Sequence, residues 1–524
     1  MRSIATRYDD DSRERQGMLL AAIGRVPLSV SKPLNELAHV LVFVAAHPAS
    51  PAIERAAMGA LERVAEHLRR QRSKTRRALE NSGLPYTPTL STYSHDLLAW
   101  MLRSPHYRVH FDSFWQPDMP LSQALSFTLP PIQSDLGHLD VDGRELLARL
   151  VPEANQRLPF LIKEFARLDD RPTFKDFLFD GLHLYLRLQP TDRTFSKAFN
   201  RIPTPATYYH SDLCRTVDLQ AIARRPLPKP RRLTPELRDS VITAARHAMM
   251  LLQRETDPTT HVDRASLRVF DLERGVSVAI YGMVAARQLP LVSYVGYTLF
   301  KNGFAAAYGG AWIFARHAQF GINVFESFRG GESAFLLCQL LRVYRQTFGV
   351  DYFEVEPYQY GQGNPEGIRS GAFWFYYRHG FRPVEPPLAA LAREEWQRIG
   401  TDRRYRTPAS VLRRLAEGPI ALPLTGRVRT SAASVRAAVT TYIQTSFGGD
   451  RVEAETASRR RFVALAGSPG RLGAEQQRVY TEVALWAAAE DIRGGAALAL
   501  LRQMIRIKPV DPYGYQRLLL RLRR

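Results

Sequence analysis

Cysteine is scarce in this chain: its 524 residues include only Cys214 and Cys338. Two thiols cannot supply a framework of disulfides or a cysteine-based zinc site, so disulfide-rich domains and cysteine-based zinc domains are both excluded. An isolated cysteine behaves most often as a small buried hydrophobic residue. We therefore expect neither thiol to be a nucleophile, and a reducing cytoplasm fits this usage best.

Long uncharged runs are also missing. No window of about 18 apolar residues occurs, which argues against a transmembrane segment. The opening stretch MRSIATRYDDDSRERQ carries charges of both signs and lacks the apolar core of a secretory signal. We expect a cytoplasmic protein without a membrane span.

Acidic residues are outnumbered: 51 Asp and Glu face 72 Lys and Arg, which gives a formal charge of +21. Such a field attracts phosphates, nucleic acid or anionic surfaces. No aromatic-interleaved nucleic-acid-binding motif accompanies the basic stretches at 69–77 and 403–414 or the closing RLLLRLRR. We expect them to be solvated helix faces, and the charge alone leaves nucleic acid open as a partner.

Hydrophobic periodicity divides the chain into three blocks, as the length predicts. Residues 1–233 repeat apolar positions at helical spacing and end in the Pro/Arg-rich stretch ARRPLPKPRRLTPE, which indicates a linker or an extended wrap. Residues 234–400 open with a helix capped by Thr234 and then alternate like strands. Residues 401–524 return to a helical, basic pattern. We expect helical regions before and after a central mixed domain.

The central block predicts an α/β (α+β) fold with a mixed, mostly antiparallel sheet. Asn302-Gly303 supplies the two positive-φ positions of a tight hairpin between two β-rich runs. A strand then leads into the turn at 329–332, a helix that ends at Gly349, and the strand VDYFEVEPY. Asn364 and Pro365 predict the start of one further helix that reaches FYYRHGF, with Gly380 beyond its end.

The turn in VFESFRGGESAFLL, which begins at Val324, has the composition of a phosphate site. A strand that enters a Gly-rich turn and then a helix gathers free backbone N–H groups at the positive end of the helix dipole. Gly330 and Gly331 permit close approach, Ser333 adds a hydroxyl, and Arg329 adds a charge. The spacing matches neither a P-loop nor the dinucleotide fingerprint.

A second segment, SGAFWFYYRHGFRPV at 370–384, resembles the closing motif of the GNAT superfamily of N-acetyltransferases. The positions that match are Ala372, Phe375, Tyr376, Arg378, Gly380 and Phe381. The turn resembles the acyl-CoA pyrophosphate loop of the same superfamily through Arg329, Gly331, Ser333 and the pair Leu336-Leu337. The resemblance covers about residues 264–386. Only MVAARQLPL separates the first strand pair from the hairpin, where the superfamily usually has two helices.

The resemblance implies an acyl-CoA substrate and a set of residues that bind it. Backbone groups of FGINVF, with Val324 and Phe325 at its end, would pair with the pantetheine arm. The pyrophosphate would lie on the N–H groups of the turn. The residues that the resemblance assigns to acyl-CoA are Val324, Phe325, Arg329, Gly330, Gly331, Glu332, Ser333, Ala334 and Asn364.

Catalysis would need a proton donor for the departing thiolate and a base for the amine. Tyr376 stands at the position of the superfamily's usual donor. Glu326 ends the strand before the turn, and Glu354 and Glu356 share one face of the next strand, opposite Phe353 and Val355. These three carboxylates are the candidate bases.

Other catalytic classes find little support. The 13 histidines include no pair at metal-ligand spacing beside an acidic residue in the central block, and we expect no metal. We predict that His317 and His379 are isolated surface residues. Gly-x-Ser-x-Gly is absent where a hydrolase would need it.

Three hypotheses follow from the sequence. The first is an acyl-CoA-dependent N-acyltransferase that acts on an unidentified amine. The second is a degenerate GNAT-like core that serves as a basic binding or scaffold module, for example for nucleic acid. The third is a transferase that takes its acyl group from aminoacyl-tRNA. The acceptor, the acyl chain length and the oligomeric state have no readable motif.

Overall fold

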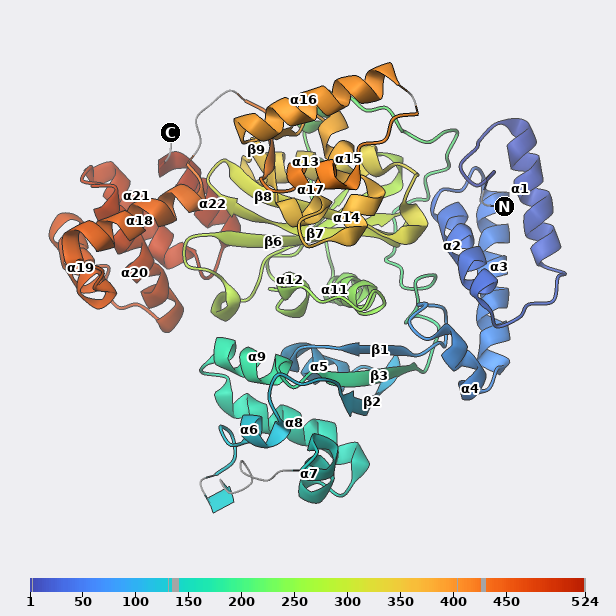
Figure 1. Cartoon of the computed structure of the whole chain (residues 1–524), viewed down its shortest axis with the longest axis horizontal. Helices are drawn as coiled ribbons and strands as arrows, with labels where there is room; N and C mark the ends of the chain where they lie inside the picture. Colours follow the sequence, from blue (N-terminus) through green and yellow to red (C-terminus); the bar gives the residue numbers. More distant parts are fainter. Residues whose placement is uncertain (2, 131, 134–140, 403, 426–429, 523–524) are drawn as a thin grey trace. The chain divides into compact units, whose positions relative to one another are not determined.

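The computed structural model describes residues 1, 3–130, 132–133, 141–402, 404–425 and 430–522 (Figure 1). The chain forms two compact units. The first unit comprises Met1–Leu213, Leu233–Thr260 and Phe300–Ala305, and the second comprises Cys214–Arg232, His261–Leu299 and Ala306–Arg524. The sequence predicted blocks that meet near residues 233 and 400. The contacts instead group the Pro/Arg-rich stretch and the C-terminal helices with the central strands.

The first unit begins with helices whose caps are visible in the sequence. Ser50 caps α3 by accepting a hydrogen bond from the Ile53 amide, and Pro51 occupies the first turn, where its missing N–H has no cost. The helices here are α1 (Asp10–Ile23), α2 (Lys32–Ala46), α3 (Pro51–Arg70) and α4 (Ser73–Arg76). α2 and α1 both pack against α3.

A three-stranded antiparallel sheet lies in the same unit, where the sequence pattern predicted helices. Its order is β1 (Thr89–Thr92), β3 (Leu184–Pro190), β2 (Tyr107–Phe114). Alternate residues of β3 are buried, as expected of a strand with one face on a core. The helices that share its core are α5 (His95–Met101), α6 (Leu121–Leu125), α7 (Gly143–Leu150), α8 (Arg157–Phe165) and α9 (Pro172–Asp180).

Thr234 caps α11 (Pro235–Met250) as predicted, because its hydroxyl accepts a hydrogen bond from the Leu237 amide. The short helix α12 (Asp257–Thr260) follows α11 in the first unit. Met250 of α11 belongs to the apolar cluster that includes the strands of the three-stranded sheet.

An eight-stranded sheet forms the centre of the second unit and confirms the predicted mixed α/β class. Its order is β10-β11-β9-β8-β7-β6-β5-β4. β8 and β9 are parallel, whereas β7–β8, β4–β5 and β9–β11 are antiparallel. The strands are β4 (Arg268–Asp271), β5 (Val276–Tyr281), β6 (Ser293–Lys301), β7 (Phe304–Phe314), β8 (His317–Val324), β9 (Tyr352–Val355), β10 (Arg382–Pro383) and β11 (Ile420–Pro423).

The hairpin between β6 and β7 turns at Asn302-Gly303, as the sequence predicted. Both residues have positive φ, 44° and 83°. A Cβ at Gly303 would lie 2.5 Å from the Ile202 carbonyl oxygen, so no other residue fits there. This tip belongs to the first unit.

The β8–turn–helix–β9 order is also confirmed. The short turn η7 (Glu326–Phe328) follows β8, α13 runs from Ser333 to Phe348, and Gly349 ends it with φ 67°. The single helix expected after Asn364 was wrong. Gly371, at φ 62°, divides it into α14 (Pro365–Ser370) and α15 (Ala372–Arg378), since a left-handed residue cannot continue the helix.

The Pro/Arg-rich stretch runs extended along the second unit, after α10 (Leu219–Arg224). The backbone amide of Arg231 donates to Val269 on β4. Buried Arg342 on α13 donates to the carbonyls of Arg225 and Pro226 and pairs with Glu273 at 2.7 Å. The predicted wrap is therefore held by main-chain groups, by the buried guanidinium of Arg342 and by the ion pair of Arg231 with Asp271.

C-terminal helices complete the second unit (orange to red in Figure 1). They are α16 (Pro386–Thr401), α17 (Ala409–Leu415), α18 (Ala432–Phe447), α19 (Arg451–Ala466), α20 (Ala474–Ala489), α21 (Gly495–Ile507) and α22 (Pro512–Leu522). Trp486 of α20 meets Phe314 of β7 edge-on at 5.6 Å within one apolar cluster. The Gln516 side chain donates to the carbonyls of Ala315 and Phe348 at 2.6 and 2.7 Å. Among the described helices, none has the length and apolar content that crossing a bilayer requires.

Candidate functional site

The parallel strands β8 and β9 pair only where they begin. Their register joins His317 to Tyr352, Ala318 to Phe353 and Gln319 to Glu354. β9 ends at Val355, while β8 continues to Val324. The second half of β8 therefore faces non-strand residues on this side. On one face of this half of β8 lies the Gln359 side chain, whose amide nitrogen would be 3.0 Å from a Cβ placed on Gly321.

The turn after β8 is open at Gly330. This glycine has φ 78°, and a Cβ built on it would meet no atom within 4 Å. Arg329 beside it is exposed, pairs with Glu366 of α14 at 2.7 Å, and donates from Nε to the Val324 carbonyl at 3.2 Å. The exposed side of the turn thus carries a cation whose ion pair is accessible to solvent.

The buried side of the turn is fixed by Glu332. This side chain is 1% exposed, pairs with Arg274 at 2.7 Å and accepts a hydrogen bond from the Cys214 amide at 2.9 Å. It does not cap α13, which has no side-chain cap. The amides of the first helical turn, at Ser333 and Ala334, cannot have intrahelical partners and lie at the positive end of the dipole.

Besides Arg329 and Glu332, other residues assigned to acyl-CoA have groups engaged within the protein, among them Gly331, whose amide donates to the Phe328 carbonyl at 3.3 Å. The Phe325 amide donates to the Ala306 carbonyl at 2.9 Å, and the Val324 carbonyl accepts from Arg329. Asn364 caps α14, with Oδ1 accepting from the Gly367 amide at 3.1 Å. These contacts shape the turn and the start of α14.

Tyr376 on α15 is buried at 3% exposure, and its phenol lies near the Ile322 backbone on β8. The rings of Phe381 and Tyr360 pack edge-on against it at 5.4 and 6.3 Å. Burial raises the pKa of Tyr376 well above its ordinary value. The phenol therefore stays protonated at neutral pH, beside the part of β8 that β9 does not cover.

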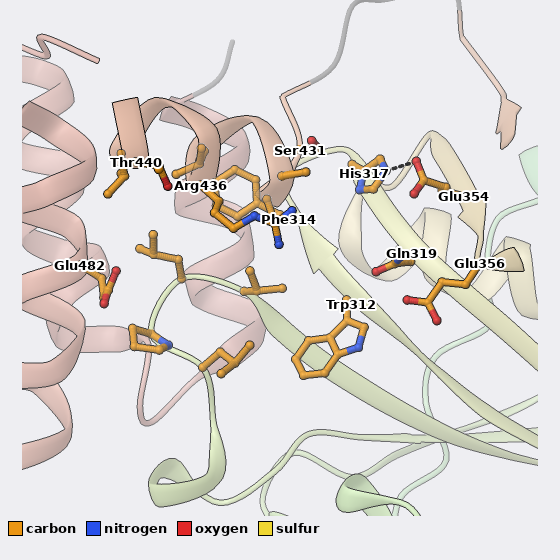
Figure 2. A pocket seen from close by; sticks show the side chains of 18 of the residues that line it. Trp312, Phe314, His317, Gln319, Glu354, Glu356, Ser431, Arg436, Thr440 and Glu482 are labelled. Carbon is orange, nitrogen blue, oxygen red and sulfur yellow. Dashed lines mark hydrogen bonds and ion pairs between the residues drawn. The ribbon is translucent and has the colours of Figure 1, made fainter. Parts of the chain in front are cut away.

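A cavity of about 620 Å³ opens on the sheet face that carries Gln319 and Glu354 (Figure 2). Glu354 and Glu356 both line it, whereas Phe353 and Val355 are fully buried, so the predicted alternation along β9 is confirmed. Glu326 and Tyr376 do not line this cavity. Its walls are Leu289, Pro290, Leu291, Val292, Trp312, Phe314, His317, Gln319, Glu354, Glu356, Ser431, Ala432, Ala433, Val435, Arg436, Val439, Thr440, Arg451 and Glu482.

His317 is not the isolated surface residue that the sequence predicted. It is 9% exposed, its Nε2 lies 3.3 Å from Oε2 of Glu354, and its ring stacks on Tyr352 at 5.3 Å. His379 is likewise engaged, through Nδ1 and the Phe375 carbonyl at 2.5 Å. The parallel pairing of β8 and β9 brings His317 to Glu354, and sequence alone gave no register for that pairing.

Sequence reasoning also missed Gln319, Trp312, Arg436 and Glu482 of the cavity. Polar His317 and Gln319 alternate with apolar Ala318 and Phe320, a pattern that marks a polar strand face. No comparable signal connects α18 or α20 to the sheet. Burial raises the pKa of Glu482, and nearby Arg451 opposes that shift.

One group of metal-ligating side chains occurs among the described residues: His95, Asp96 and Asp169 in the first unit. Nζ of buried Lys175 lies 2.6 Å from Asp96 and 2.7 Å from Asp169. An ammonium ion thus balances both carboxylates. We assign no metal to this group.

Comparisons of the chain with protein-family models, with curated proteins and with solved structures return no match.

Proposed function

We propose that the chain is an acyl-CoA-dependent N-acyltransferase with a GNAT-like core, which moves an acetyl or longer acyl group to an amine. One observation carries the proposal. The part of β8 that β9 leaves uncovered leads directly to an uncapped helix start, and a buried phenol lies against the same stretch of β8.

The donor would bind along that stretch. First-turn amides at Ser333 and Ala334, together with the open Gly330, suit a pyrophosphate. Arg329 would exchange its exposed partner Glu366 for a phosphate oxygen, at small cost because an exposed ion pair contributes little to stability. The buried ion pair of Glu332 and Arg274 holds the loop from beneath.

The chemistry is transfer between a thioester and an amine. The amine nitrogen attacks the thioester carbonyl, a C–N bond forms, and the C–S bond breaks. A carboxylate accepts the proton of the amine, and Tyr376 gives a proton to the departing thiolate. Glu354 and Glu356 are better placed as bases than Glu326, because they line the cavity.

A cytoplasmic location is part of the proposal. Both cysteines are free, and burial raises the pKa of the Cys338 thiol to about 12, which keeps it protonated and unreactive. The protein is then suited to a reducing compartment.

Thermal unfolding with CoA and acetyl-CoA tests the proposal. A ligand that binds only the folded state must raise the melting temperature, and we expect a rise at micromolar CoA. Mass spectrometry of amine mixtures incubated with acetyl-CoA then tests transfer. Absence of a shift at millimolar CoA, together with salt-sensitive binding of RNA or DNA, would favour the scaffold hypothesis. Transfer from aminoacyl-tRNA without any response to CoA would favour the third.

A further inference from the structure

The cavity has one long apolar wall. Leu289 and Leu291 from the β5–β6 loop and Val439 of α18 supply aliphatic side chains to the lining. Trp312 adds an aromatic side chain, and its indole is held at 4.3 Å in a stack on Tyr294. Leu289 is 46% exposed, unusually open for a leucine. At about 620 Å³ the cavity lies within the range of small-molecule sites, roughly 300–1,000 Å³.

Charged side chains of both signs line the cavity. Arg436 of α18 and Glu356 after β9 form no ion pair with any residue of the described ranges. Figure 2 shows Arg436 reaching from its helix toward the sheet, with Glu356 on the sheet side and Glu482 on the opposite side. A cavity lined by an arginine and a glutamate that do not pair with each other suits a ligand that carries one negative and one positive charge.

We propose that this cavity binds an α-amino acid or short peptide with an apolar side chain, its carboxylate at Arg436 and its amino group at Glu356. The apolar wall takes the side chain. The carboxylate of Glu354, held by His317, lies next to Glu356 on the same face and completes an anionic corner for the amine.

Ligands with charge of only one sign fit less well. A polyamine would bring several positive charges toward Arg436 and Arg451, and like charges are repelled in a partly enclosed site. A dicarboxylate would face Glu354, Glu356 and Glu482. An amphoteric ligand with one charge of each sign balances the site.

The role of this ligand as acyl acceptor rests on the proposed function. The amine would lose its proton to Glu356 or Glu354, and the product would be an N-acyl amino acid or N-acyl peptide. Binding itself requires no acyl-CoA, so the two proposals are tested separately.

Calorimetry with the full chain, in the absence of CoA, provides the test. The probes are phenylalanine, phenethylamine, which lacks the carboxylate, and 3-phenylpropanoate, which lacks the amine. We expect phenylalanine to bind about tenfold or more tightly than either, since it makes both charge-assisted contacts. The dipeptides Phe-Gly and Gly-Phe separate a free amino acid from a peptide as the preferred ligand.

Charge-neutral variants test which residue binds the carboxylate of the ligand and which binds its amino group. Arg436→Gln should lose about tenfold in affinity for phenylalanine and nothing for phenethylamine. Glu356→Gln should lose affinity for phenylalanine and phenethylamine alike, and nothing for 3-phenylpropanoate. Arg471→Gln, an exposed arginine outside the cavity, is the matched control and should change neither.

Equal binding of phenylalanine and phenethylamine would overturn the inference, as would absence of binding by every amphoteric probe at millimolar concentration. Phenylalanine binding without any response to CoA would keep the inference and remove the acyltransferase. Acyl transfer to other amines, without binding of amino acids or dipeptides, would support the acyltransferase and overturn the inference about its acceptor.

Discussion

Nε2 of His317 lies 3.3 Å from Oε2 of Glu354, across the short parallel pairing of β8 and β9. The contact joins the start of β8 to β9 immediately before the two strands part. It places an imidazole and a carboxylate on the cavity face. The candidate site therefore lies next to the point where the pairing of β8 and β9 ends.

Tyr376→Phe should lower acyl-transfer turnover by about a hundredfold while leaving CoA affinity nearly unchanged. The phenyl ring keeps the packing against Phe381, but the proton donor is lost. Stability should fall by less than about 1.5 kcal/mol, because removal of one hydroxyl group removes at most one hydrogen bond. Steady-state kinetics and calorimetry measure these effects. Tyr377→Phe, which alters a buried neighbour, is the control. Full activity of the Tyr376 variant would refute the donor role.

Gly330→Asp should weaken CoA binding about tenfold or more by placing an anion where the pyrophosphate would lie. Gly330→Asn is the matched control, because asparagine has nearly the same shape and both residues tolerate positive φ better than most. The open space around Gly330 lets either side chain enter without a clash. Calorimetry with CoA compares the two. Equal affinities would show that no phosphate approaches this turn.

Glu332→Gln should destabilise the fold by about 2 kcal/mol, because it removes the ion pair between Glu332 and the largely buried Arg274. Glu366→Gln breaks the exposed pair with Arg329 and should cost less than about 1 kcal/mol. Urea denaturation provides both values. Should the Glu332 variant weaken CoA binding with no loss of stability, this carboxylate would contact the ligand instead of supporting the loop.

Glu482→Gln should stabilise the protein at pH 7 and have little effect at pH 4. Burial raises the pKa of Glu482 in the folded state, so the folded protein holds this proton more firmly than the unfolded chain. Its favourable contribution is complete below the unfolded pKa and is lost as pH rises through the folded pKa. Melting temperatures at both pH values test this, and exposed Glu417→Gln is the control. An equal rise in melting temperature at both pH values would show that the effect does not come from the raised pKa of Glu482.

Local chemistry made the central elements predictable. The hairpin at Asn302-Gly303 and the end of α13 at Gly349 each depend on a residue that tolerates positive φ. Alternation of Glu354 and Glu356 follows from strand geometry alone. These features need no knowledge of distant parts of the chain.

Long-range pairing made other elements unpredictable. β11 is the four-residue stretch Ile420–Pro423, too short for a clear period, and it exists because it pairs with β9 and β10. Arg436 reaches the candidate site only because α18 packs beside the sheet. The break at Gly371 was visible as a glycine, but nothing local distinguished a tolerated helical glycine from a stop.

One glutamine has a consequence for how the protein matures. The Gln516 amide hydrogen-bonds carbonyls of Ala315 and Phe348, which precede it by 201 and 168 positions. A ribosome therefore releases the β7–β8 corner and α13 long before it makes α22. Until α22 packs against the sheet, the carbonyl oxygens of Ala315 and Phe348 must hydrogen-bond to water. The native hydrogen bonds of these two carbonyls therefore form only after the C-terminal helix has been synthesised.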